Sequence, residues 1–179
     1  MLPTHDAPAA PPDPFRTGLG LFLVSAAVLA LQVLQTRVLS VQMWHHHSYM
    51  VVTMTLLGFA AAGSLATVVP GLARGDVARK LAWCATLFAA STLLGFLVLD
   101  RTADHAARMT AEGRYLALSL FYGYLVVPYL LAGLVVTLAL STAARVPRLY
   151  AANLGGSALG VWLFIALVAP LGAERLLVL

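Results

Sequence analysis

Five long apolar runs, separated by short polar segments, set the pattern of this 179-residue chain. An α-helix of 20 residues rises about 30 Å, the thickness of the hydrocarbon core of a bilayer. Each run is close to that length or longer. The runs cover residues 17–44, 48–73, 81–99, 115–144 and 151–173. The pattern therefore predicts an all-α, polytopic helical membrane protein with about five transmembrane helices.

Both ends of the chain depart from this pattern. Residues 1–16 hold five of the nine prolines and predict a disordered tail, which leaves 17–179 as the helical domain. The tail has no basic start, and the run after it is too long for a cleaved signal peptide, so we expect a retained first span. The last four residues, 176–179, follow a charged pair and resemble the first turn of a sixth span. This ending is typical of a truncated product or of a fragment of a longer chain.

Composition supports a membrane location. The chain is 61% apolar and 10% charged, whereas a soluble domain carries about 25% charged residues. Its net charge of +4 is scattered between the apolar runs, which suits anionic lipid headgroups and offers no basic block for nucleic acid. Cys84 is the single cysteine, so the chain has no intramolecular disulfide and no cysteine metal site.

The basic residues predict an orientation. With the N-terminus inside, the inner segments hold six Lys or Arg residues and the outer segments hold five, or four if Arg37 lies within the first helix. The positive-inside rule then places the N-terminus in the cytoplasm, and we expect a multi-pass protein of a bacterial-type inner membrane. This orientation puts the histidine cluster on the outer face.

Three consecutive histidines, His45, His46 and His47, follow Trp44 between the first two runs. Neutral imidazole binds zinc, copper or haem iron, and His46 is the best candidate ligand. Consecutive residues of a helix point about 100° apart, however, so the three cannot all face one ion. We favour an aromatic-rich interfacial turn and keep a haem or metal site as the alternative.

Arg37 is the only charge between Thr17 and Ala73. An arginine inside a span is costly and suggests function, whereas an arginine near a helix end extends to the headgroups by snorkelling. Both interpretations stay open. Gln32 lies closer to the Arg37 face than Gln35 does, which makes a small polar patch on this helix possible.

Small residues and one proline mark the later helices. Gly58 and Gly63 in the second run, and Gly156 and Gly160 in a GxxxG of the fifth, favour close helix packing in lipid. Asn153 can hydrogen-bond across helices. Pro128 predicts a kink beside a tyrosine set that either lines a quinone or lipid pocket or packs in an ordinary way. That set is Tyr122, Tyr124 and Tyr129.

Two stretches together resemble a known family. The first is LQVLQTRVLSVQMWHHHSYMVVTMTLLGFAAAG at 31–63, and the second joins VVPYLLAGLVVTLAL to RVPRLYAANLGGSALGVWL within 126–163. They resemble the N-terminal transmembrane region of membrane-bound spermidine synthase-like proteins, a polyamine aminopropyltransferase-like family. The resemblance places ten residues at motif positions: Arg37, His46, Gly58, Gly63, Pro128, Gly133, Tyr150, Asn153, Gly156 and Gly160.

The chain departs from this family in two ways. The family usually has an acidic residue at the position of Asn153, and it often has one at the position of Gln32. The loss of these carboxylates weakens any ion-pair or proton role there. The family's soluble Rossmann-like domain, which would bind decarboxylated S-adenosylmethionine and a polyamine, is absent from the sequence. The resemblance therefore implies a membrane module rather than spermidine synthesis.

These patterns predict a non-catalytic integral membrane module, which is an anchor, a scaffold or a ligand-binding subunit. No nucleophile–base pair or paired carboxylate lies on a suitable element, and we predict no cofactor. The alternatives are a membrane redox subunit that binds haem, metal or quinone near residues 45–47, and a small transporter. Expected partners are the lipid bilayer, other membrane proteins or a second copy of the chain, without nucleic acid.

Overall fold

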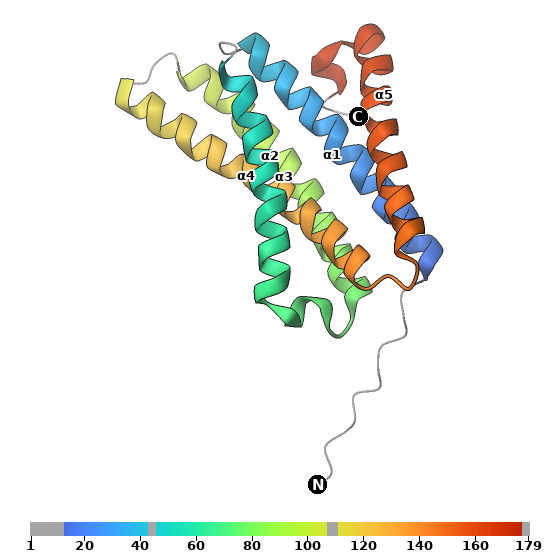
Figure 1. Cartoon of the computed structure of the whole chain (residues 1–179). Helices are drawn as coiled ribbons and strands as arrows, with labels where there is room; N and C mark the ends of the chain where they lie inside the picture. The colour runs from blue at the N-terminus through green and yellow to red at the C-terminus, as the bar shows by residue number, and fades with distance from the viewer. Residues whose placement is uncertain (1–12, 43–45, 107–110, 177–179) are drawn as a thin grey trace.

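The computed structural model describes residues 13–42, 46–106 and 111–176 (Figure 1). Within these ranges it describes the side chains at 13–40, 49–97, 113, 116 and 119–167. The fold is all-α, and this confirms the predicted class. The helices are α1 (Pro14–Gln42), α2 (His46–Val68), α3 (Val77–Ala106), α4 (Ala111–Ser141) and α5 (Val146–Leu176), with a short 3₁₀ turn, η1 (Pro70–Ala73), after α2.

All five α-helices are long and apolar enough to cross a membrane, as the sequence pattern predicts. The apolar spans within them are Pro14–Ser40, Tyr49–Val68, Val77–Leu97, Ser119–Ser141 and Val146–Leu167. Large apolar side chains such as Trp83, Leu94 and Trp162 point outward from the bundle. Lipid is the solvent that accommodates such a surface.

The helix α4 forms the centre of the bundle. Half of its apolar span is buried, against 6% of the span of α3. It packs against α2, α3 and α1, while α5 packs mainly against α1 on the other side (Figure 1). The start of α1, the α2–α3 connection and the α4–α5 connection all lie at the same end of the bundle. We call this the N-terminal end.

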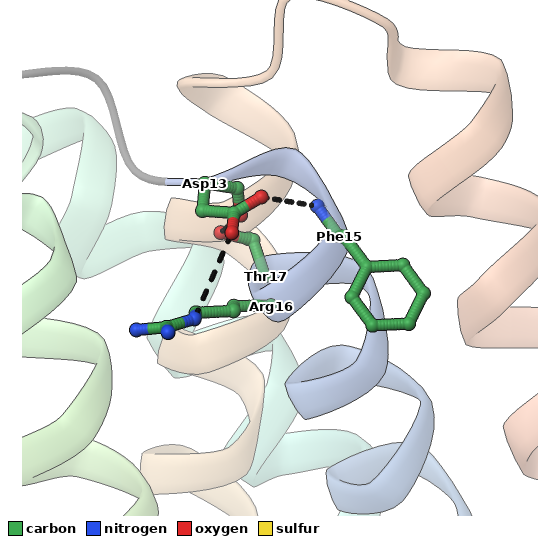
Figure 2. A network of polar contacts seen from close by, with 4 residues as sticks. All are labelled: Asp13, Phe15, Arg16 and Thr17. Carbon is green, nitrogen blue, oxygen red and sulfur yellow. Dashed lines mark hydrogen bonds and ion pairs between the residues drawn. The ribbon is translucent and has the colours of Figure 1, made fainter.

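Helix α1 begins three residues earlier than the predicted span (Figure 2). Asp13 is the reason, since its Oδ1 accepts a hydrogen bond from the Phe15 backbone N–H at 3.0 Å. Pro14 at the first helical position needs no donor partner and has a φ angle suited to a helix. The predicted tail of residues 1–16 is thus wrong for its last three residues, while residues 1–12 lie outside the described part.

Helix α3 also begins earlier than predicted, at Val77 rather than Leu81. Asp76 accepts a hydrogen bond from the Arg79 backbone N–H at 3.1 Å and so caps the first turn. Lys80 then turns back toward the end of η1 and donates to the carbonyl oxygens of Gly71 at 2.7 Å and Arg74 at 2.6 Å. The polar segment between the second and third predicted runs therefore contains a helix cap and a tight turn.

Two glycines hold α5 against α1. A Cβ atom added to Gly156 would meet the carbonyl oxygen of Phe22 and lie 2.9 Å from its carbonyl carbon. A Cβ atom at Gly160 would meet the carbonyl oxygen of Ala26 and lie 2.7 Å from that carbon. Neighbouring backbone cannot move aside as a flexible side chain can. The two helices therefore approach this closely only because both positions lack a side chain.

The contact between α2 and α4 has the same origin. A Cβ atom at Gly58 would lie 2.7 Å from Cβ of Tyr129, and one at Gly133 would lie 2.8 Å from Cβ of Ala62. Gly63, which the sequence also marks for packing, has no other atom within 4 Å of its would-be Cβ among the described residues. Gly63 therefore serves as a matched control for the glycines at helix contacts.

We expect Gly160→Leu to lower the free energy of unfolding by about 1–3 kcal/mol, the usual cost of overpacking. Gly63→Leu, which adds the same side chain to open space, should not lower it and should raise it by up to about 1 kcal/mol, because leucine favours a helix more than glycine does. Thermal unfolding of the two variants in the same detergent measures this difference. Equal midpoints would show that the α1–α5 contact is looser than described.

Candidate functional site

A buried polar cluster lies where α1, α2 and α4 meet. Tyr129 on α4 is completely buried, and its hydroxyl donates a hydrogen bond to Oε1 of Gln35 on α1 at 2.5 Å. The Thr55 side chain on α2 lies beside Tyr129, and its hydroxyl donates to the Val51 carbonyl oxygen at 2.8 Å. Gln35 and Thr55 are themselves 8% and 4% exposed. Three neutral polar side chains, one from each helix, thus meet inside an apolar bundle.

Close backbone packing positions this cluster. Gly58 brings α2 against α4 at Tyr129, and Thr55 lies one turn before Gly58 on the same face of α2. Leu31 and Leu39, four residues to either side of Gln35, are both buried, so Gln35 lies on the buried face of α1. The helix spacing therefore carries these polar groups into the core together with their apolar neighbours.

The cluster is closed to solvent and satisfied. Every buried side-chain nitrogen or oxygen among the described residues has a hydrogen-bond partner. The cavity beside Gln35 and Phe121 has a volume of only about 10 Å³. A single water needs about 10–15 Å³, so this cavity cannot admit a quinone or a haem. The cluster's geometry therefore suits cohesion between helices, since an unsatisfied polar group in lipid costs several kcal/mol.

The three tyrosines near Pro128 do not line a common pocket. Tyr124 donates a hydrogen bond to the Ser91 carbonyl oxygen on α3. Tyr122 packs edge to face with Phe121, with ring centroids 5.8 Å apart. Tyr129 points to α1 and α2 instead. Helix α4 continues through Pro128 without a break. Tyr124 and Tyr129 thus join α4 to its neighbours, while Tyr122 belongs to an apolar cluster with Leu39 of α1 and Val51 of α2.

A second polar contact joins α1 to α5. The Ser25 hydroxyl donates to Oδ1 of Asn153 at 2.7 Å and also lies 2.7 Å from the Leu21 carbonyl oxygen. Ser25 is 3% exposed. Asn153 precedes Gly156 by one turn, so the hydrogen bond and the glycine contact belong to the same interface. A carboxylate at this position would place a charge beside a buried hydroxyl, whereas the amide is neutral.

Arg37 stands apart from both polar contacts. It lies within α1, five residues before the helix ends, and its side chain is exposed at the surface of the bundle. Its carbonyl oxygen accepts a hydrogen bond from the Ser40 hydroxyl at 2.8 Å. Gln32 is half-buried. Gln35 is therefore the polar residue of this part of α1 that points into the bundle. Arg37 points out of the bundle.

The side chains of the three histidines lie outside the part of the chain that the structure describes. His45 lies outside the described residues, and His46 and His47 begin α2 with side chains that are not described. In the described part of the chain, no three His, Cys, Asp or Glu residues are grouped closely enough to hold a metal ion. A haem or metal site at His46 therefore stays a prediction from sequence.

No family model, curated protein or solved structure matches the chain. The likeness to the spermidine synthase-like family thus rests on its motifs alone.

We expect Tyr129→Phe to lower the free energy of unfolding by about 1–2 kcal/mol, because the Gln35 amide loses its partner in an apolar interior. In Tyr129→Phe/Gln35→Leu both polar groups are gone, and the loss should be smaller than the sum of the two single losses. Unfolding in detergent micelles measures this cycle. Tyr49→Phe, at an exposed tyrosine, is the control and should be neutral. Additive losses would refute the coupling.

Proposed function

We propose that this chain is a non-catalytic integral membrane module that anchors or scaffolds a partner at the membrane. The observation that supports this proposal is that its buried polar side chains hydrogen-bond to one another between helices. Tyr129 hydrogen-bonds Gln35 and Ser25 hydrogen-bonds Asn153, so the buried polar side chains join helices to one another. Such contacts build a stable frame, whereas a catalytic or transport site needs polar groups directed at a substrate.

The family resemblance supports the same role. Motif positions Gly58 and Gly133 lie at the α2–α4 contact, and Asn153, Gly156 and Gly160 lie at the α1–α5 contact. Pro128 is buried beside Tyr129. Most of the motif therefore encodes the assembly of helices. A chain similar to the membrane part of a spermidine synthase-like protein would then supply the frame to which a soluble catalytic partner is attached.

The proposed location is a bacterial-type inner membrane with the N-terminus in the cytoplasm. Six basic residues lie at the N-terminal end of the bundle, which the positive-inside rule places in the cytoplasm. They are Arg16, Arg74, Arg79, Lys80, Arg145 and Arg148. A fluorescent protein that matures only in the cytoplasm, fused to the N-terminus, checks this orientation: a dark fusion in intact cells contradicts it.

Optical spectra and elemental analysis of the protein purified in mild detergent test the module against a redox subunit. We expect no absorbance band of haem or quinone and less than about 0.1 metal ion per chain, because the cavity beside the polar cluster has a volume of only about 10 Å³. A near-stoichiometric chromophore or metal that is lost in His46→Ala would overturn the scaffold proposal and make the histidine cluster the active centre.

A further inference from the structure

A large cavity lies at the N-terminal end of the bundle, between the start of α1, the end of α4 and the start of α5. Its volume is about 660 Å³, within the range of ligand pockets. Most of its wall is apolar, with Phe15 and Gly18 from α1, Ala143 after α4, and Leu149 from α5. Arg145 and Arg148 also line it. The cavity thus combines a long apolar wall with two guanidinium groups.

Arg145 and Arg148 are the polar side chains of this cavity that can bind a ligand, because the other polar side chains in its wall already donate hydrogen bonds. Two threonines also line it, but the Thr17 hydroxyl donates to the Asp13 carbonyl oxygen at 3.0 Å and the Thr142 hydroxyl to the Leu138 carbonyl oxygen at 2.7 Å. Both Arg145 and Arg148 are exposed, and no carboxylate among the described residues forms an ion pair with either.

The carboxylate at the start of α1, that of Asp13, forms an ion pair with Arg16 and not with Arg145 or Arg148. Asp13 lies 3.6 Å from the Arg16 side chain and accepts the Phe15 backbone N–H, as Figure 2 shows. That ion pair lines a second cavity of about 350 Å³ on the α3 side of α1. The cation of the smaller cavity therefore has a counterion within the chain, and the two cations of the larger cavity have none among the residues whose side chains the structure describes.

The start of α5 adds to this positive charge. The N-terminal end of a helix carries a partial positive charge, and natural helices usually place acidic residues there. The first turn of α5 has no acidic residue and instead contains Arg148, directly after Arg145 and the helix start. The positive charges of Arg145 and Arg148 repel each other and the partial positive charge at the start of α5. A bound anion would relieve this repulsion.

We propose that the 660 Å³ cavity binds an anionic phospholipid, with its phosphate on Arg145 and Arg148 and an acyl chain along the apolar wall. The cavity lies at the ends of the apolar spans of α1, α4 and α5, where the headgroups of a bilayer lie. Arginine presents a planar set of donors that matches phosphate. The proposal goes beyond the scaffold function and does not depend on it.

Native mass spectrometry of the delipidated protein in detergent tests this proposal, with phosphatidylglycerol and phosphatidylcholine as probes. We expect phosphatidylglycerol to bind more tightly than phosphatidylcholine. Arg145→Gln/Arg148→Gln should weaken phosphatidylglycerol binding about 30-fold, since each of the two basic side chains contributes about 1 kcal/mol to binding anionic lipid and about 1.4 kcal/mol is a factor of ten. Arg74→Gln/Arg79→Gln removes the same charge at the same end of the bundle, outside the cavity, and should keep binding within about twofold of the unaltered protein.

A second variant tests the apolar wall. A Cβ atom at Gly18 would lie 3.7 Å from Leu149 Cδ2, an ordinary contact, so Gly18→Leu should fill the cavity and weaken phosphatidylglycerol binding while both arginines remain. Equal losses in the two arginine pairs would overturn the proposal in favour of general surface charge. Equal binding of the two lipids would also overturn it. Competition by soluble glycerophosphoglycerol at the concentration of the full lipid would point to a free phosphate site instead.

Discussion

The structure depends on the absence of side chains at a few helix positions. In lipid, helices gain little from burying apolar surface against each other, because the surrounding acyl chains are equally apolar. Gly156 and Gly160 let α5 approach the α1 backbone near Phe22 and Ala26, and Gly58 lets α2 approach α4. Dispersion contacts and Cα–H···O contacts then act at short range.

The polar contacts follow from this close packing. Ser25 reaches Asn153 because the glycines one and two turns beyond Asn153 bring α5 near α1. Tyr129 reaches Gln35 within a core where Gly58 has brought α2 up to α4. In a medium without water such neutral pairs fix the register of one helix on another, because sliding by one turn would leave both partners unsatisfied. Packing and hydrogen bonding thus specify the same arrangement of helices.

The sequence predicts the fold class well and the contacts only in part. Length and apolarity suffice for the spans, since both are set by the bilayer. The Gly156–Gly160 spacing predicts a close helix contact, yet it cannot tell α1 from another helix or another chain. Residues 76–80 lie outside the predicted runs, whereas Asp76 caps the start of α3 and Lys80 closes a turn. The position of Arg37 favoured Gln32 over Gln35 for a polar patch, whereas Gln35 is the buried one, as the leucines four residues before and after it on the same helix face indicate.

The most direct test of the account is the proximity of α1 and α5 in the native membrane. In a Cys84→Ser background, Ser25→Cys/Asn153→Cys places two thiols where the side chains now hydrogen-bond at 2.7 Å. Ser25→Cys/Leu154→Cys moves the second thiol to an exposed neighbouring position. The account predicts efficient cross-linking of the first pair within one chain by a short bifunctional thiol reagent, and little of the second. Cross-linking only between chains, or equal yields for the two pairs, would contradict it.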